Sequence, residues 1–507
     1  MNRARWWIPF AVLAGVLCAQ SPAPQRLGAR PSGPFTGAAA QVSATSPFPA
    51  GCNGAQTGTL YENGPVEPFL AADPHNPAHL VGVWQQDRWS NGGANGVLAA
   101  VSNDSGRTWA ISQPRFSICA GGAWERASDP WVSIAPDGTV HFIALTLNGA
   151  GAVTAVLASR STDGGVTWSD PVTLDQPPAG SDKESITADP TDAHYVYAIW
   201  DQTNLNLHVP AWFSRSTDGG VTWEPARVIY NPGTDGYATA NQIVVLPSGT
   251  LLDVFTLSYE SGGTRQPGAF TAVMASADRG ATWATPVVVS TNQTIGTVDA
   301  KTQLSLRTGA GIPSAAVDPV SGAVYLVWSD ARFSNGARDG IAFSKSLDGG
   351  VTWSAPVQVN QAPNVQAFTP VVAAAAGGTV AVTYYDFRQD TDDVTKLLAN
   401  AWRLTSLDAG ATWSETPLAG PFDMLSAPRA TGPFLGDYQA MASSGSLFVA
   451  FFAAANSGNA ANPSSVIASS FVRPPDTRNN GRIEINLHPR PYHHGDEPEP
   501  PKARARK

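Results

Sequence analysis

The chain has 507 residues, of which only 14% are charged, and its formal net charge is −9. A nucleic-acid-binding surface needs a basic face to neutralise phosphates, so this composition argues against nucleic acid as a partner. The chain also contains 48 Gly, 41 Pro and 16 Trp, which together with the low charge indicates a rigid, strand-rich extracellular protein.

The N-terminus reads MNRARWWIPFAVLAGVLCAQ, in which Arg3 and Arg5 precede a short apolar run from Trp6 to Ala19. This pattern is typical of a secretory signal peptide, and a membrane anchor is the alternative. We predict a signal peptide over residues 1–19, no membrane span in the mature chain, and a secreted, periplasmic or cell-surface location. Residues 20–38, rich in Pro, Ala and Gly, are predicted to form a flexible lead.

Two cysteines remain after the predicted signal peptide, Cys52 and Cys119. An even pair in an exported protein suggests a disulfide, and two buried free thiols are the alternative. Neither a Cys-x-x-Cys pattern nor a histidine partner accompanies them. We therefore predict no metal site and no cofactor.

An octapeptide of the form Ser-x-Asp-x-Gly-x-Thr-Trp recurs along the chain at a spacing of about 60 residues, which indicates a repeat architecture. STDGGVTW occurs twice, and four near-copies surround it. The aspartates of the six copies are Asp104, Asp163, Asp218, Asp278, Asp348 and Asp408. Ser and Asp side chains bond nearby backbone groups in turns, and Gly supplies the unusual backbone angles. Because a mechanism needs one or two acids rather than six equivalent ones, we predict that these aspartates are structural.

Each octapeptide belongs to a longer unit, seen most clearly at residues 312–360. Strands are expected there at 314–317, 324–328, 340–345 and 357–359, with the octapeptide between the third and the fourth. Four short antiparallel strands with such turn signals form one blade of a propeller. The starts of the units lie near Glu67, Asp129, Lys183, Asn241, Pro313, Thr369 and Gly436.

The last of these units lacks both the octapeptide and a fourth strand. Residues 40–43 (AQVS) resemble the missing strand, and we expect them to complete the last blade and close the ring. The prediction is an all-β fold, a β-propeller of four-stranded antiparallel blades over residues 39–473, with seven blades favoured and six as the alternative. Residues 474–507 are polar and rich in Pro and are predicted to be a disordered tail.

The six octapeptides resemble the Asp-box, or bacterial neuraminidase repeat, of a superfamily of propellers whose best-known members are sialidases. The resemblance covers roughly residues 40–473 and implies a propeller with six Asp-box turns. It implies less about activity, because Asp-boxes also occur in other glycosidases, in sorting receptors and in non-catalytic propellers.

Substrate sites of this superfamily lie on the face opposite the Asp-boxes, where the second strand of each blade ends. Acids, arginines and aromatics gather at those ends and at the neighbouring strand starts, and arginine forks suit a carboxylate while paired acids suit glycosidic cleavage. The predicted catalytic residues are Asp330, Tyr385, Glu260, Asp87 and Asp201. The predicted substrate-binding residues are Arg88, Arg126, Arg332, Arg388 and Trp89.

The resemblance to sialidases implies a tyrosine nucleophile paired with a glutamate, which here would be Tyr385 or Tyr384 with Glu260. Asp87, Asp201 or Asp330 would then be the acid/base. The Arg-Ile-Pro motif of sialidases is absent from the expected place, which reads Val66-Glu67-Pro68-Phe69. A purely structural alternative is that Asp330 with Arg332, and Asp386 with Arg388, form mutual salt bridges.

Three functions follow from these observations, and the least favoured is a polysaccharide lyase, which would need a Tyr or His base beside a charge-neutralising group. The first is a secreted, sialidase-like glycoside hydrolase that acts as a monomer on an exo-linked sugar, acidic or neutral, of a glycan or glycoconjugate. The second is a non-catalytic propeller that binds a glycan or a protein on the same face.

Overall fold

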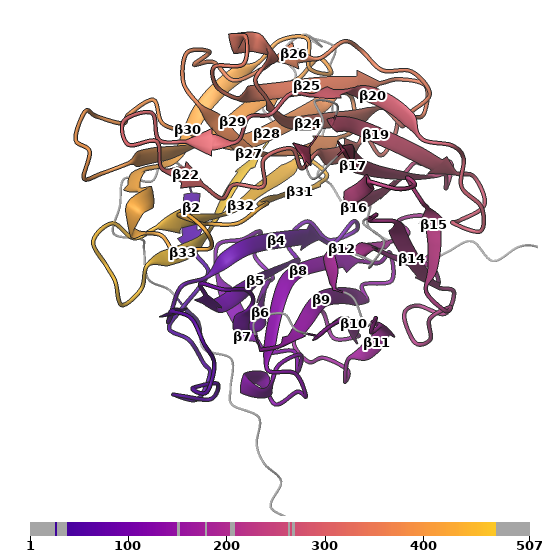
Figure 1. Cartoon of the computed structure of the whole chain (residues 1–507). Helices are drawn as coiled ribbons and strands as arrows, with labels where there is room; N and C mark the ends of the chain where they lie inside the picture. The colour runs from indigo at the N-terminus through magenta and orange to yellow at the C-terminus, as the bar shows by residue number, and fades with distance from the viewer. Residues whose placement is uncertain are drawn as a thin grey trace, which may run out of the picture. The chain divides into compact units, whose positions relative to one another are not determined.

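The computed structural model describes residues 26–27, 38–149, 153–177, 180–202, 208–261, 264–265 and 269–472 (Figure 1). The chain divides into two units, Met1–Arg473 and Pro474–Lys507, and the description below concerns the first. The predicted signal peptide, the predicted tail and most of the predicted lead lie outside the described residues.

The described residues form antiparallel sheets, most of which have four principal strands, and they contain no α-helix. Each group of four strands is named here by its first strand. The β4 unit contains β4 (Val66–Ala72), β5 (Leu80–Trp89), β6 (Ala94–Ser102) and β7 (Trp109–Ser112). The β8 unit contains β8 (Arg126–Ile134), β9 (Val140–Asn148), β10 (Val153–Ser161) and β11 (Val172–Asp175). The β12 unit contains β12 (Ser181–Ala188), β13 (Val196–Gln202), β14 (Ala211–Ser216) and β15 (Arg227–Tyr230). The β16 unit contains β16 (Gly236–Val245), β17 (Leu251–Ser261), β19 (Ala269–Ser276) and β20 (Val287–Asn292).

The remaining units follow the same plan. The β23 unit contains β23 (Ser314–Val317), β24 (Val324–Asp330), β25 (Gly340–Ser346) and β26 (Val357–Gln358). The β27 unit contains β27 (Ala367–Ala375), β28 (Thr379–Asp386), β29 (Leu398–Ser406) and β30 (Ser414–Asp423). The β31 unit contains β31 (Ala440–Ser444), β32 (Leu447–Ala455), β33 (Ser464–Val472) and, from the other end of the chain, β2 (Ala38–Gln41).

Short elements complete the described part. The strands are β1 (Arg26–Leu27) beside β7, β3 (Leu60–Tyr61) and β18 (Thr264–Arg265) beside β5 and β17, and the pair β21 (Thr297–Val298) and β22 (Ser305–Leu306). The 3-10 turns are η1 (Ile118–Ala120), η2 (Arg332–Ser334) and η3 (Met424–Ser426).

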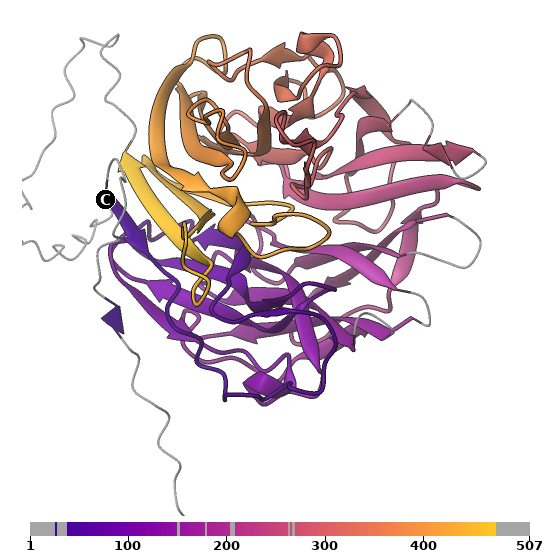
Figure 2. The same ribbon diagram turned by 60° about the vertical axis from the view of Figure 1, so that its left-hand side comes forward.

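The first strands of the units contact one another in a closed cyclic order. The contacts run β4–β8–β12–β16–β23–β27–β31 and return from β31 to β4. The return is completed by β2, whose Ala40 pairs with Ala468 of β33, so the indigo and yellow ends of the described chain lie side by side (Figure 2). This pairing confirms the predicted closing strand, and it removes an exposed sheet edge.

Hydrophobic side chains fill the space between neighbouring sheets. One such cluster joins Tyr325 and Phe343 of the β23 unit to Val380 and Val382 of the β27 unit. The second strands β5, β13, β24 and β28 are buried along their whole length, because another sheet packs on each face. β-Branched and aromatic residues suit this two-sided environment.

Side-chain hydrogen bonds hold the octapeptides in a shared turn. In one copy Asp163 accepts from the backbone N–H of Thr167 at 2.9 Å and from the hydroxyl of Ser161 at 2.7 Å, while Gly165 N–H donates to the Ser161 hydroxyl. The turns also contact the preceding unit, since His79 lies 3.0 Å from the carbonyl of Gly164. They therefore lie at the end of the sheets opposite the starts of the first strands.

Five first strands share a bulge near their N-terminal end. Each bulge contains a non-glycine residue in the left-handed region, with φ between 49° and 58°. These residues are Glu67, Asp129, Lys183, Ala240 and Thr369. Such backbone conformations are costly, and bulges of this kind re-aim side chains next to functional sites.

Candidate functional site

Ionisable side chains from several units meet where the bulged first strands begin. The group, called the central cluster, consists of Glu67, Asp129, Lys183, Arg307 and Asp437. The ammonium of Lys183 lies 3.0 Å from Oδ2 of Asp129 and 3.0 Å from Oδ2 of Asp437. Glu67 joins them because its Oε1 accepts from the backbone N–H of Asp437 at 3.1 Å.

The side chain of Gln85 links two of these carboxyl groups. Its Nε2 donates to Oε2 of Glu67 and lies 3.5 Å from Oδ1 of Asp129. Its Oε1 accepts from Arg88 at 2.8 Å, and the Arg88 guanidinium lies over the Phe434 ring. Arg88, a predicted substrate-binding residue, is thus buried behind the cluster rather than at its surface.

Arg307 supplies the second cation of the cluster. Its Nε lies 3.0 Å and 3.1 Å from the two carboxylate oxygens of Asp437, and its terminal nitrogen also bonds that carboxylate. With 34% of its side chain exposed, Arg307 is more open to solvent than Lys183, at 14%. Arg307 did not emerge from the sequence, because it follows the two-residue strand β22 in the connection between the β16 and β23 units rather than one of the principal strands.

The cluster holds its carboxyl groups in different protonation states. Burial, and then the charges of Asp129 and Asp437, raise the pKa of Glu67 to about 8. Burial alone would raise the pKa of Asp129, but Lys183 and the Ser128 hydroxyl outweigh it and lower that pKa. At neutral pH Glu67 is therefore protonated while Asp129 is ionised, a division typical of acid and base partners.

A cavity of about 100 Å³ lies beside the cluster. Its lining includes Lys183, Glu184, Asn241, Gln439 and an aromatic group. In that group the rings of Phe69 and Trp131 stack at 3.5 Å between centroids, and Tyr438 meets Trp131 edge-on at 5.5 Å.

Asp201 is the predicted catalytic residue placed nearest the cluster. It lies opposite Asp182 in the β12–β13 ladder, and its Oδ2 accepts from the backbone N–H of Ala240 at 3.2 Å. Burial raises the pKa of Asp201. Three other predicted catalytic residues, Asp87, Asp330 and Tyr385, make their hydrogen bonds in other parts of the protein.

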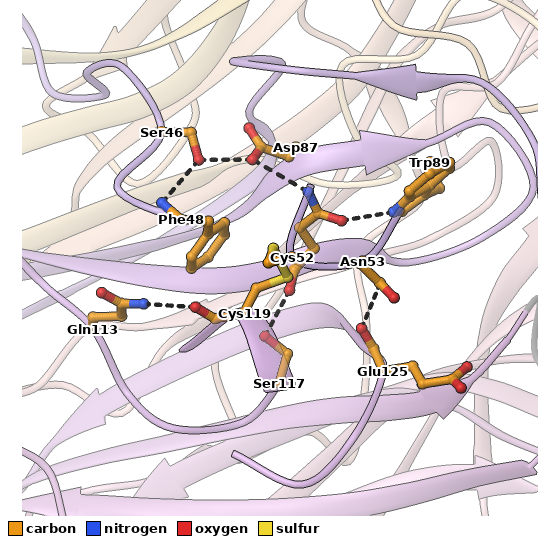
Figure 3. The surroundings of a disulfide bond; sticks show 11 residues. Ser46, Phe48, Cys52, Asn53, Asp87, Trp89, Gln113, Ser117, Cys119 and Glu125 are labelled. Atoms are coloured by element: carbon orange, nitrogen blue, oxygen red, sulfur yellow. Dashed lines mark hydrogen bonds between the residues drawn. A yellow bond between two sulfur atoms is a disulfide. The ribbon is translucent and has the colours of Figure 1, made fainter. Parts of the chain in front are cut away.

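Asp87 and Arg126 both hold the segment that contains the disulfide. Asp87 is buried and accepts from the Ser46 hydroxyl at 2.7 Å (Figure 3). It also accepts from the backbone N–H of Asn63 at 2.8 Å. Arg126 donates to the carbonyl of Thr57 at 3.1 Å. Its guanidinium lies 4.8 Å from the Trp89 ring, so Trp89 is a packing partner here.

The predicted disulfide between Cys52 and Cys119 is present (Figure 3). It joins the segment before β3 to η1, which lies ahead of β8. Next to it, the side-chain amide of Asn53 donates to the carbonyl of Glu125 at 2.7 Å.

The two Asp–Arg pairs form the mutual salt bridges that the sequence left as an alternative. Arg332 lies 2.8 Å from Asp330, which also accepts from Trp328. Arg388 lies 2.6 Å from Asp386 and also pairs with Glu415.

Neither predicted tyrosine faces the central cavity. Tyr385 is buried in the core between β28 and β32 and donates to the carbonyl of Ala453 at 2.8 Å. The Tyr384 hydroxyl bonds Glu415 and accepts from Arg388 at 2.8 Å. Glu260 lies in β17, and its side chain is outside the described part of the structure.

The chain matches no protein-family model and no curated protein. Solved structures similar to it include a Hadza microbial sialidase, with 14% identity, 88% of this chain and 95% of that chain covered, and a TM-score of 0.42. They also include the GH93 α-L-arabinofuranosidase of Fusarium graminearum, at 13% identity, 86% and 98% coverage and a TM-score of 0.45. A third is the intramolecular trans-sialidase of Ruminococcus gnavus, at 13% identity, 85% and 97% coverage and a TM-score of 0.40.

These likenesses are distant and assign neither a family nor an activity to the chain. In the described residues no helix has the length and hydropathy needed to cross a bilayer.

Proposed function

We propose that the protein is a glycoside hydrolase that acts on an exo-linked sugar of a glycan, with the central cluster as its reaction centre. One observation carries this proposal. Carboxyl groups from three separate units converge on one ammonium and one amide, and burial keeps one of them protonated beside ionised partners. Hydrolysis of a glycosidic bond needs such a pair, one acid to protonate the leaving oxygen and one carboxylate.

The proposed roles follow from these environments. Glu67 is the general acid, and Asp129, kept ionised by Lys183, is the carboxylate that activates water or stabilises the sugar cation. Glu67 is only 1% exposed, so the substrate must displace a covering contact. We propose that the Arg307–Asp437 ion pair is that contact, because Arg307 is more exposed than Lys183. A carboxylate on an acidic sugar would compete with Asp437 for the Arg307 fork.

As the fold, we propose a β-propeller of seven blades with Asp-box turns. The closed order of the first strands and the closing pairing of β2 with β33 support it. The disulfide supports the proposed export of the protein into an oxidising compartment. We also propose that the protein is a monomer.

A glycan-binding propeller without catalysis is the second candidate. The salt bridges of Asp330, Asp386 and Asp437 with arginines favour this candidate, because an acid that is paired with an arginine is neutralised. A sialidase-type pair of Tyr385 with Glu260 is the third arrangement to be tested.

The experiment is hydrolysis of a panel of acidic and neutral fluorogenic glycosides, α-sialosides included, by the purified mature protein. For a glycoside that is turned over, Glu67→Gln and Asp129→Asn should each lower kcat/KM by about 10²-fold or more. Tyr385→Phe and Asp330→Asn are the comparison variants and should keep most of the activity.

Activity that survives in Glu67→Gln and is abolished in Tyr385→Phe would contradict the central cluster and favour the tyrosine pair. Absence of turnover across the panel, with saturable binding on a glycan array, would favour the second candidate.

A further inference from the structure

Four buried oxygen atoms in the lining of the central cavity have no hydrogen-bond partner. They are both carboxylate oxygens of Glu184, Oδ1 of Asn241 and Oε1 of Gln439. The three residues are 2%, 2% and 3% exposed, so bulk water does not solvate these oxygens. Buried acceptors without a partner are rare in proteins and call for an explanation.

The two amides are oriented by their nitrogen ends. Nδ2 of Asn241 donates to the carbonyl of Ala238 at 3.1 Å, and Nε2 of Gln439 donates to the carbonyl of Thr369 at 2.5 Å. Because a carbonyl cannot face an amide oxygen, these contacts fix which end is the oxygen. The oxygens, rather than the NH₂ groups, are therefore the unpartnered ends.

Three hydroxyl donors of the cavity lining are engaged elsewhere. The hydroxyls of Ser185, Thr369 and Tyr438 donate to the carbonyls of Asn241, Thr308 and Pro130. The ammonium of Lys183 is likewise engaged by two carboxylates of the central cluster. None of these four groups donates to the unpartnered oxygens.

The unpartnered atoms of the cavity are all oxygens, and none of them is a donor. A positive ion would pair with such oxygens and offset the cost of burying them.

We propose that the central cavity binds a hard cation through oxygen ligands, with Ca²⁺ as the ion tested first. Glu184 would supply its carboxylate, and Asn241 and Gln439 their amide oxygens. Ca²⁺ takes carboxylate, amide carbonyl and water oxygens in flexible geometry, which suits a site with a single carboxylate. Within the described part of the chain, no group of three or more His, Cys, Asp or Glu side chains is arranged for a metal ion. The proposed site differs from such groups because two of its three ligands are amides.

The test uses the mature protein after treatment with a chelator. Calorimetric titration with Ca²⁺ should show one site per chain, and Ca²⁺ should raise the unfolding temperature. Glu184→Gln should weaken Ca²⁺ binding at least tenfold. Glu224→Gln is the matched control, because Glu224 pairs with Arg215 near the octapeptide of the β12 unit. This variant should bind Ca²⁺ with the affinity of the wild type.

A luminescence measurement locates the ion. Tb³⁺ bound in place of Ca²⁺ should emit when tryptophan is excited, because Trp131 lines the cavity. Trp131→Phe should lower the emission and leave the Ca²⁺ affinity unchanged. If Glu184→Gln does not fold, Gln439→Met removes one ligand oxygen without changing the charge and should also weaken binding.

Binding of Na⁺ or K⁺ instead, lost in Glu184→Gln, would support the site with a different ion. The proposal would be overturned if Ca²⁺, Mg²⁺, Na⁺ and K⁺ all gave neither a heat of binding nor a shift of the unfolding temperature. It would also be overturned if an ion bound with the same affinity to Glu184→Gln, Gln439→Met and the wild type. These readouts do not depend on turnover, so they separate the cation site from the proposed hydrolase.

Discussion

Glu67 and Asp129 are joined through one amide, because Nε2 of Gln85 donates to Glu67 and lies 3.5 Å from Oδ1 of Asp129. The two acids come from the first strands of neighbouring units. Both have left-handed backbones, with φ of 52° and 49°, so the bulges that carry them bring equivalent positions of two repeats together. The two acids therefore occupy the same position of the repeated bulge but differ in pKa. Burial raises the pKa of Glu67, whereas Lys183 lowers that of Asp129.

The first prediction concerns the pH dependence of turnover. If Glu67 is the general acid, its protonated form is the active one, and its pKa of about 8 sets the alkaline limb. We expect kcat/KM on an active glycoside to fall as the pH rises through about 8. A pH–rate profile of the wild-type protein measures this. A flat profile between pH 6 and pH 10 would exclude Glu67 from proton donation.

The second prediction concerns stability and needs no substrate. The pKa of Glu67 is raised from 4.5 to about 8 on folding, so between these values the folded state binds more protons than the unfolded state. Glu67 should therefore make the protein less stable as the pH rises through that window, by up to about 1.4 kcal/mol per pH unit. Urea unfolding at pH 5 and pH 8 should show a smaller loss in Glu67→Gln than in the wild type. In Glu224→Gln, a surface comparison, the loss should equal that of the wild type.

Short-range chemistry explains what could be predicted from the sequence. The four strands expected in the β23 unit match the observed β23–β26 to within two residues at each end. The octapeptide turn could be predicted from the sequence because its hydrogen bonds join residues at most four positions apart. The closing strand was predictable because residues 40–43 repeat the pattern of other fourth strands.

The site was harder to predict because its contacts join distant parts of the chain. Tyr384 and Tyr385 point to opposite faces of β28, yet both are buried, since a sheet packs on each side. Strand alternation therefore could not single out a residue that faces substrate. Arg307 reaches Asp437 across 130 residues, from a segment without a strand pattern. The sequence placed Glu67 and Asp129 at the right strand starts, but their coupling through Gln85 depends on the bulges.

The third prediction concerns the octapeptide aspartates. Burial alone would raise the pKa of Asp218, but hydrogen bonds from Thr222 and Ser216 outweigh it and lower the pKa to about 2. A lowered pKa stabilises the folded state above pH 4, and that contribution is lost as the pH falls toward 2. Asp218→Asn should therefore lower the urea midpoint at pH 7 and have little effect near pH 2. Asp170→Asn, at a solvent-exposed position, is the control and should change neither midpoint. If both variants lowered the midpoint at pH 7 equally, the aspartate of the turn would have no special role in stability.

The fourth prediction concerns the disulfide, which closes a separation of 67 residues. Replacing Cys52 and Cys119 together by Ala should lower the free energy of unfolding by about 2–4 kcal/mol. The segment it anchors also holds Asp87 and Arg126. Hydrogen exchange should therefore increase around residues 45–63 before it increases in the β23 unit. Uniform exchange across the protein would instead indicate that the bond acts only on the unfolded state.

The last prediction concerns the closure of the ring by β2. A chain that begins at Val42 lacks β2 and leaves one edge of β33 unpaired, whereas a chain that begins at Ala38 keeps β2 intact. Both versions lack β1, so they differ only in the closing strand. The version without β2 should unfold at a temperature several degrees lower and should associate with itself, because an unpaired edge strand accepts a strand from another copy. Thermal unfolding and light scattering of the two proteins measure both effects. Equal unfolding temperatures would show that contacts among the first strands hold the ring closed without β2.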